Sequence, residues 1–432
     1  MPSRLILIVL ASIWVANAQD KNAIAALEEL GKICESEGQA MWGHSLCGPM
    51  MLVDPATRTV IANHADSQNR FRHEGALFTG PFPEPFTPSN TAIHWDGQEW
   101  STVLIPLPLD PFRRLSLLVH EAFHRIQPAL GISGSDAPNE HLDTEDGRIW
   151  LRMELRAMGQ ALRMQEAIAR RAAADAMLFR MYRHSLFPGS AEREAAMERQ
   201  EGLAEYTGAF AALKTTGESV NREARIIESL EDSDAMARSF AYATGPALGL
   251  MLDRFTQGWR PRVAHTPMDA MLIWGLKVPT PNDLRRAAEE RAVFYGYPAV
   301  VRAEHERDQR RRDLASELNV KFMQGPVLDF PSSPEMYRNF NPMALTPFPP
   351  HGTYYPTGTF TAPWGKLQVD SGGALLAPDN RSVRVPVPSN FHPSESAGAA
   401  IQGEGWALHL SNGWKIIPAR NRGSFLVVRA EP

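Results

Sequence analysis

The sequence has little cysteine and, beyond its first residues, no long hydrophobic run, and each shortage excludes a class of protein. Its 432 residues include two cysteines, Cys34 and Cys47, which are too few for a cysteine-rich zinc site. Their spacing leaves two states open, one disulfide in an exported protein or two buried thiols. After the N-terminal run, no segment has the ~20 apolar residues that a membrane-spanning helix requires.

The chain also lacks an excess of positive charge. It has 44 Lys and Arg residues against 49 Asp and Glu residues, for a formal net charge of -5. The one visible run of arginines, Arg310–Arg312, falls in a helical segment of mixed charge, which is typical of a solvated helix face. No basic stripe indicates a nucleic-acid partner.

The first 18 residues have the pattern of a secretory signal peptide. Arg4 supplies the positive charge, Leu5–Val15 forms the apolar run, and Ala16–Ala18 is a small-residue cleavage site. The residue after that site is Gln19 rather than a cysteine, so a lipid anchor is not expected. The pattern predicts an exported protein, periplasmic or extracellular, that is cleaved near Ala18 and has no stable membrane anchor.

Hydrophobic periodicity predicts an α+β protein whose parts follow one another along the chain. After the leader, residues 19–110 are expected to form an N-terminal α/β part that opens with a helix over 22–37. Its strands are predicted over residues 50–53 and 59–62, joined by a turn, and over 91–95 and 100–105, which form another hairpin with Asp96 and Gly97 in the turn.

The rest of the chain separates into helical, irregular and β segments. Residues 111–320 have helical periodicity and are expected to form a mainly helical region. Residues 321–356 are dense in proline, which predicts a connector. Residues 357–432 have strand patterns and predict a small all-β domain, in which Ser411–Gly413 indicates a hairpin turn between the two flanking strands.

The most informative motif is His-Glu-x-x-His, formed by His120, Glu121 and His124 in a segment with helical periodicity. Residues four apart lie on one face of a helix, so both histidines can bind one metal ion. Glu121 lies beside them, where it can accept a proton from a metal-bound water. This arrangement is typical of zinc hydrolases, most often metallopeptidases. Phe123 and Ile126 are expected in the core beneath the metal helix.

A catalytic zinc site usually has three protein ligands, so a third must come from elsewhere in the chain. Glu201 and Glu205 are four apart in a predicted helix, so one can bind the metal while the other holds a ligand histidine. Glu145 and Glu154 are nearer candidates, but neither has an acidic residue four positions later. Gln127 is expected to have a structural role rather than a catalytic one.

The motif at 120–124, followed by Glu201-Gly202-Leu203-Ala204-Glu205-Tyr206, resembles the gluzincin clan of metallopeptidases. The whole chain resembles uncharacterised secreted bacterial members of this type. The resemblance implies a zincin-like, mainly helical catalytic domain with one Zn²⁺ per chain. Its ligands would be His120, His124 and Glu201, and Glu205 would support a ligand histidine.

The same resemblance carries expectations about the substrate. It implies a peptide or protein that pairs, in extended form, with the strand at 100–105. His124 and Glu201 are 77 positions apart, which is longer than in thermolysin-like enzymes. The inserted helices would therefore cover and restrict the cleft, unless the third ligand is another glutamate.

The leading hypothesis is a secreted zinc-dependent peptidase in which Glu121 is the general base. A tetrahedral oxyanion needs a further donor, and the resemblance favours Tyr242, with a tyrosine packed in a helix as the alternative. Tyr206 and His141 are weaker candidates. Two other functions stay open, a non-catalytic binding protein on a metallopeptidase scaffold and a zinc hydrolase of a non-peptide substrate. The β domain has three tryptophans that are expected either to contact a ligand or to fill its core, Trp364, Trp406 and Trp414.

Overall fold

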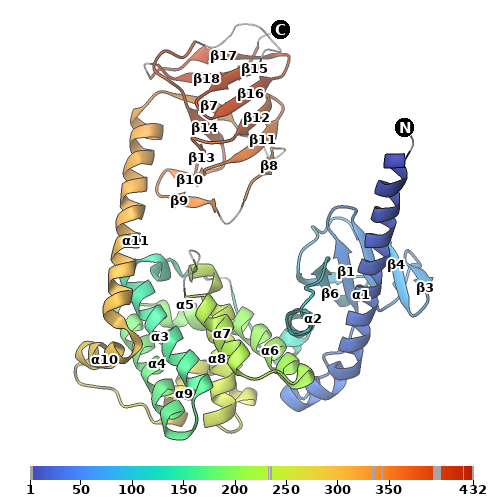
Figure 1. Ribbon diagram of the computed structural model, residues 1–432, viewed down its shortest axis with the longest axis vertical. Coiled ribbons are helices and arrows are strands. Elements are labelled where there is room, and N and C mark those ends of the chain that lie inside the picture. The colour runs from blue at the N-terminus through green and yellow to red at the C-terminus, as the bar shows by residue number, and fades with distance from the viewer. Residues whose placement is uncertain are drawn as a thin grey trace. The chain divides into compact units, whose positions relative to one another are not determined.

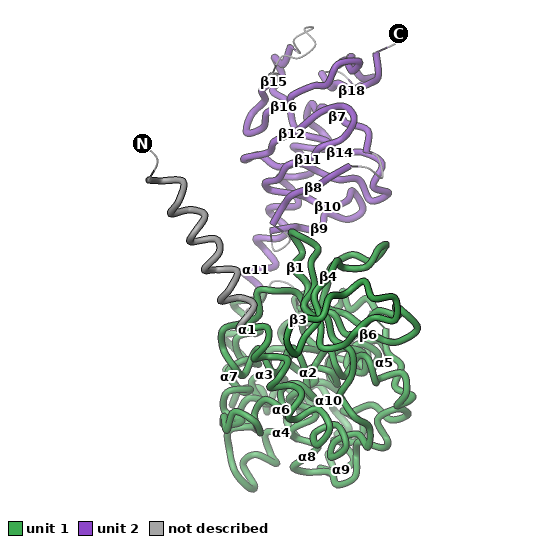
Figure 2. Tube along the Cα trace, turned by 90° about the vertical axis from the view of Figure 1, so that its right-hand side faces the viewer, with its two compact units in different colours: residues 1–304 green, residues 305–432 purple. Residues whose placement is uncertain are grey.

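The chain folds as an α+β protein with two compact units, residues 1–304 and residues 305–432 (Figures 1 and 2). The computed structural model describes the backbone of residues 3–135, 137–231, 233, 236–332, 336–341, 344–392, 400–421 and 423–430. The side chains of residues 3–21 lie outside this description, and with them the leader expected over residues 1–18. Among the described residues, no helix is both long and apolar enough to cross a membrane.

The first unit begins with a long helix and a mixed sheet. The helix predicted over 22–37 lies within the longer α1 (Ser3–Trp42). The strand order is β3-β4-β2-β1-β6-β5, with β1 antiparallel to β2 and parallel to β6. The strands are β1 (Met50–Asp54), β2 (Thr59–Ala62), β3 (Arg72–Glu74), β4 (Leu77–Pro81), β5 (Thr91–Trp95) and β6 (Gln98–Leu104).

The two hairpins predicted in this region are confirmed. β1 pairs with β2, and β5 pairs with β6 through a turn at Asp96 and Gly97, both of which have positive φ. The expectation that the strand at 100–105 lies at the edge of the cleft is wrong. That strand is β6, which is hydrogen-bonded on both sides, so the edge of the sheet is β5.

The two cysteines form a disulfide, which decides between the alternatives that the spacing left open. Cys34 in α1 and Cys47 before β1 are bonded, with Cα atoms 4.8 Å apart. The carbonyls of Leu46 and Cys47 accept hydrogen bonds from Arg125 of the following helix, at 3.0 and 2.8 Å. The disulfide therefore ties α1 to the loop that contacts α2, and it is typical of an oxidising compartment.

The helical part of the first unit begins at α2, which is capped by Asp110 where its carboxylate accepts from the N–H of Arg113. One stretch, η3, is a π-helix, which continues directly into α6. The elements are α2 (Pro111–Ile126), η1 (Gln127–Leu130), η2 (Glu140–Asp143), α3 (Glu145–Arg163), α4 (Glu166–Leu186), α5 (Ser190–Met197), η3 (Glu198–Gly202), α6 (Leu203–Thr216), α7 (Asn221–Ser229), α8 (Met236–Phe255), η4 (Arg260–Arg262), α9 (Met268–Leu276), α10 (Leu284–Ala292), η5 (Val293–Tyr295) and α11 (Tyr297–Leu318), which continues past the unit boundary.

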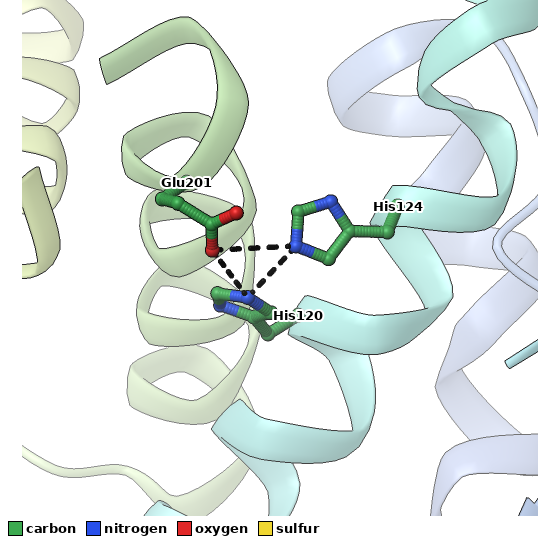
Figure 3. Close-up of side chains that lie close together, drawn as sticks. All are labelled: His120, His124 and Glu201. Carbon is green, nitrogen blue, oxygen red and sulfur yellow. Dashed lines mark hydrogen bonds and ion pairs between the residues drawn. The ribbon is translucent and has the colours of Figure 1, made fainter. Parts of the chain in front are cut away.

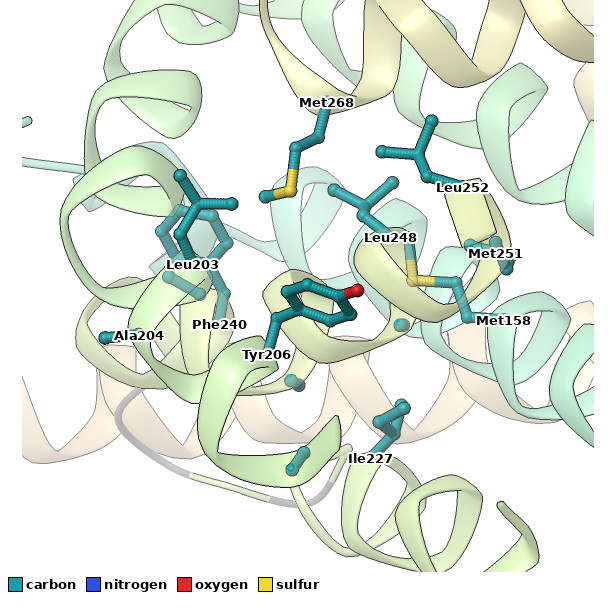
Figure 4. Packing of buried hydrophobic residues seen from close by; sticks show 14 of the residues in the cluster. Met158, Leu203, Ala204, Tyr206, Ile227, Phe240, Leu248, Met251, Leu252 and Met268 are labelled. Atoms are coloured by element: carbon teal, nitrogen blue, oxygen red, sulfur yellow. The ribbon is translucent and has the colours of Figure 1, made fainter. Parts of the chain in front are cut away.

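The core of the first unit joins the sheet to the helices. Phe123 and Ile126 of α2 are buried, as expected. Behind α6, the ring of Tyr206 lies among aliphatic and aromatic side chains that include Leu203, Phe240 and Leu248 (Figure 4). This packing fixes α6 against α8 and so determines where the residues on their outer faces stand.

The second unit is a pair of sheets around its own core. One sheet has the order β17-β18-β7-β14-β13-β10-β9 and the other β15-β16-β12-β11-β8. Trp364 and Trp406 are buried in this core and Trp414 packs against it, so all three contribute to packing. The strands are β7 (Val327–Pro331), β8 (Tyr337–Asn339), β9 (Thr346–Phe348), β10 (Gly352–Tyr355), β11 (Gly358–Ala362), β12 (Gly365–Val369), β13 (Ala374–Leu376), β14 (Ser382–Pro386), β15 (Ala400–Gly403), β16 (Trp406–Leu410), β17 (Trp414–Pro418) and β18 (Phe425–Arg429).

Two expectations about this unit are wrong. The proline-dense segment 321–356 is not a connector, because β7 to β10 lie in it and belong to the two sheets. Of its described prolines, Pro326 precedes β7, Pro331 ends it and Pro347 lies in β9 at the edge of its sheet, positions where a missing N–H is tolerated. The turn at Ser411–Gly413 does not close a hairpin, because β16 and β17 belong to different sheets. There the chain crosses from one sheet to the other.

Candidate metal centre

The metal helix α2 is held against the sheet by packing and by one buried hydrogen bond. The hydroxyl of Ser101 in β6 donates to the carbonyl of Glu121 at 2.8 Å. His120 and Glu121 are 5% and 3% exposed, respectively. The amphipathic pattern of α2 thus buries two neighbouring side chains of the motif, His120 and Glu121.

His120, His124 and Glu201 converge, and among the described residues they are the one group that could hold a metal ion (Figure 3). The Nε2 atoms of the two histidines are 3.0 Å apart. The Oε2 atom of Glu201 lies 3.5 Å from Nε2 of His120 and 3.6 Å from Nε2 of His124. The third ligand predicted from the sequence is therefore brought to the two histidines by η3, on a separate helix.

The hydrogen bonds behind the imidazoles fix which nitrogen faces this point. Nδ1 of His120 lies 2.8 Å from Oε2 of Glu205, and a carboxylate can only accept, so Nδ1 carries the proton. Nδ1 of His124 lies 3.0 Å from Oε1 of Gln127, whose Nε2 donates to the carbonyl of Arg199. When both rings are neutral, their Nε2 lone pairs therefore point at the same position. The two lone pairs repel each other unless a cation lies between them.

The distances agree with a tetrahedral ion. Bonds of about 2.0–2.1 Å to tetrahedral zinc place ligand atoms about 3.3–3.4 Å apart, close to the separations between His120, His124 and Glu201. In the metal-free protein, burial lowers the pKa of His120, but hydrogen bonds donated to Glu201 and Glu205 outweigh this effect and raise the pKa to about 10. The residues present therefore fit a bound cation, because they already stabilise positive charge between the rings.

Glu121 is a buried carboxylate with a raised pKa. Burial raises its pKa, while the charges of His120 and His124 lower it in part. Its Oε2 is buried and has no hydrogen-bond partner among the residues that the structure describes. A buried oxygen of this kind needs a partner from outside the protein, such as a water at the metal.

The π-helix η3 brings Glu201 close to α8. Gly202 crosses Gly245 of α8 so closely that a Cβ on Gly202 would lie 3.0 Å from the Cα of Gly245. This crossing places Tyr242 beside Glu201, to whose Oε2 the phenol donates at 2.7 Å. The ring of Tyr242 lies parallel to that of His120, with centroids 6.0 Å apart. Burial and the charge and hydrogen bond of Glu201 raise the pKa of Tyr242, so it is a neutral donor at neutral pH.

These groups line a cavity of about 910 Å³ in the first unit. Its wall includes Asn90, Thr91 and Ala92 at the start of the edge strand β5, and none of its described residues is Lys or Arg. Glu121, Glu201 and Glu205 thus face a common space that no described Lys or Arg lines. Volumes up to about 1,000 Å³ are typical of ligand sites.

No family model, curated protein or solved structure matches this chain. Its function must therefore be argued from the chemistry of the site.

Four other candidates from the sequence do not reach the site. Glu145 begins α3 and does not line the cavity. Tyr206 is buried behind α6, where its hydroxyl donates to Asp253 at 2.6 Å. Glu154 and His141 belong to a buried set of ion pairs that we call the ionic cluster. Its members are Glu154, Arg180, Arg183, Glu194 and Glu198, with His141 and His184 at its side.

Two features of the site could not be found from the sequence motifs. The position of β5 in the wall depends on the pairing of β6 with β1, which are distant in the sequence, and periodicity does not give such pairing. The structural role expected for Gln127 did not include its contacts, which are with His124 and with the carbonyl of Arg199 two residues before Glu201. A glutamine three residues after the second histidine is the only local signal for it.

Proposed function

We propose that this protein is a zinc-dependent hydrolase that cleaves peptide bonds, with a zincin-like catalytic region of the gluzincin type. The observation that carries this proposal is the convergence of His120, His124 and Glu201 with the unpartnered carboxylate oxygen of Glu121 beside them. Two imidazoles and one carboxylate form the ligand set of zinc peptidases that keep a fourth position for water.

The donor set favours zinc, with one ion per chain. Imidazole nitrogens suit zinc better than they suit calcium or magnesium, which prefer oxygen ligands. Bound here, the ion would lower the pKa of a water and polarise a substrate carbonyl. Glu205 would hold the tautomer of His120 that leaves Nε2 free to bind.

The protein side chains around the ion would move protons and hold charge. Glu121 would accept the proton of the attacking water and pass it to the leaving amine nitrogen. Tyr242 would donate its hydroxyl hydrogen to the oxyanion that develops on the substrate carbonyl. Both residues line the cavity and both stand beside the ligands, as these roles require.

The shape of the cavity supports a peptide or protein substrate. The strand β5 lies at the edge of its sheet, and its first residues form part of the cavity wall. An extended peptide can pair with such an edge through main-chain hydrogen bonds. The Cys34–Cys47 disulfide supports an exported protein, in agreement with the leader predicted over residues 1–18.

The decisive experiment compares Glu121→Gln with wild type in zinc content and in hydrolysis of a peptide library. We expect about one zinc per chain in both proteins and a rate that is lower by roughly 10²–10⁴-fold in the variant. Glu290→Gln, on the exposed face of α10, is the matched control and should behave as wild type.

The other outcomes assign the alternatives. An active Glu121→Gln protein would overturn the proposal. Zinc binding without hydrolysis of any peptide or ester would favour a binding protein on this scaffold. Hydrolysis of esters but not of peptides would favour a zinc hydrolase of a non-peptide substrate.

A further inference from the structure

The two metal-binding segments are joined by a single side chain. Gln127 is the first residue after α2, in η1, and is 3% exposed. Its Oε1 lies 3.0 Å from Nδ1 of His124, and its Nε2 donates to the carbonyls of Arg199 and Gln200 at 2.7 and 3.4 Å. Those carbonyls belong to the two residues that directly precede Glu201.

The orientation of this amide is determined by its partners. The carbonyls of Arg199 and Gln200 can only accept, so the nitrogen of the Gln127 amide must face them. The oxygen then faces His124, whose Nδ1 must donate. Gln127 thus directs the Nε2 lone pair of His124 toward the metal position.

The π geometry of η3 explains why this turn can use a side-chain donor. In an α-helix the N–H of Leu203 would donate to the carbonyl of Arg199, four residues back. Here the N–H of Leu203 donates to the carbonyl of Glu198, five residues back. The carbonyl of Arg199 therefore does not receive the hydrogen bond that Leu203 would donate to it in an α-helix. The amide of Gln127 supplies a donor to that carbonyl at 2.7 Å.

We infer that Gln127 is the positioning residue that couples the two halves of the metal site. It acts on His124 through its oxygen and on the turn of Glu201 through its nitrogen, and it holds the two elements at the separation that one ion requires. Outer partners of metal ligands typically contribute 10–100-fold to metal affinity. The inference rests on the metal site proposed above.

The test uses two substitutions that remove different parts of this link. Gln127→Met is similar in size and removes both functions, whereas Gln127→Glu keeps an acceptor for His124 and loses the donor to the carbonyls. Gln160→Met is the matched control, because Gln160 lies on α3 and does not line the cavity. Zinc affinity is measured by chelator competition, and site geometry by the visible absorption spectrum of the Co²⁺ form.

We expect Gln127→Met to lower zinc affinity about 10–100-fold and to alter the Co²⁺ spectrum. Gln127→Glu should show a smaller loss with a similar change in spectrum, and it carries the test if Gln127→Met does not fold. Wild-type affinity and spectrum in both variants would overturn the role of Gln127 and leave the metal site standing. Absence of metal binding in wild type and in Gln160→Met would overturn the metal site, and this inference with it.

Discussion

Glu198 and Glu201 lie three positions apart on one π turn, yet they enter two buried groups of opposite character. Glu198 accepts from both terminal nitrogens of Arg180, at 2.9 and 2.6 Å, within the ionic cluster. Glu201 faces two histidines and Tyr242 in a cavity that no described Lys or Arg lines. The same π turn thus carries two different carboxylates. Glu198 is paired with a guanidinium, and Glu201 faces two imidazoles and the open cavity.

The two groups differ in how their buried carboxylates are paired. In the ionic cluster, Glu154 bridges Arg180 and Arg183, and Glu194 pairs with Arg183, so each carboxylate has a guanidinium partner. The charge of Arg183 contributes to holding the pKa of Glu194 well below its usual range, against the effect of burial. At the candidate metal centre the carboxylates of Glu201 and Glu205 have no guanidinium partner among the described residues and pair with the imidazole of His120 instead.

The largest effect should come from breaking the ionic cluster. Glu154→Leu leaves Arg180 and Arg183 short of one buried carboxylate, and loss of one member of a buried pair costs about 3–5 kcal/mol. Urea unfolding of zinc-loaded protein should show this loss, while the rate per folded molecule stays at the wild-type value. A loss below about 1 kcal/mol would mean that the cluster is not a stabilising unit.

The next effect concerns a residue of the metal centre whose loss should not change stability. Tyr242→Phe removes the proposed oxyanion donor and should lower kcat roughly 10²–10³-fold with zinc content unchanged. Tyr297→Phe, at the start of α11 and away from the cavity, is the control. A variant with normal kcat but weaker zinc binding would instead make Tyr242 a support for Glu201, to which it donates.

The smallest effect, on stability, should come from removing the metal. At a free zinc concentration 100 times the Kd, chelation should lower the free energy of unfolding by about 2.7 kcal/mol. The chelated protein should also lose stability with rising pH. The pKa of His120 is about 10 in the folded chain and 6.5 in the unfolded chain, so its contribution is present below pH 6.5 and lost by pH 10.

Thermal unfolding across this pH range, with and without zinc, measures that difference. Zinc on Nε2 replaces the proton of His120, so the loaded protein should lack this part of the decline. Burial and the charge of Glu205 raise the pKa of Glu223 to about 8, which destabilises both forms as pH rises from 4.5 to 8. Glu223→Gln removes that shared part, and equal pH profiles of its loaded and chelated forms would contradict a cation between His120 and His124.

The sequence was sufficient where the determinants are local. The four-residue spacing in α2 and in the turn of Glu201 and Glu205 predicted which side chains would meet, and it favoured Glu201 over Glu154 and Glu145 correctly. The α+β class, the main helical region and some of the strands also followed from periodicity. That the ligands hold zinc and hydrolyse peptides stays a prediction.

The parts that could not be predicted depend on contacts between distant segments. The Ser411–Gly413 turn has the composition of a hairpin, but the sheet to which each flanking strand pairs is decided by the core around it. Proline density in 321–356 indicated irregular chain, although short strands form there and two of them, β7 and β9, contain a proline. The role of Gln127 depends on a π turn 72 positions away in the sequence.

The crossing of Gly202 over Gly245 has a consequence for recognising this site in other chains. A side chain at either position would push the π turn and α8 apart and separate Tyr242 from Glu201. Gly202 directly follows Glu201, and Gly245 follows Tyr242 by three positions. The pattern to search for is therefore His-Glu-x-x-His-x-x-Gln, then Glu-Gly-x-x-Glu, then Tyr-x-x-Gly, with the spacing between the three pieces left free.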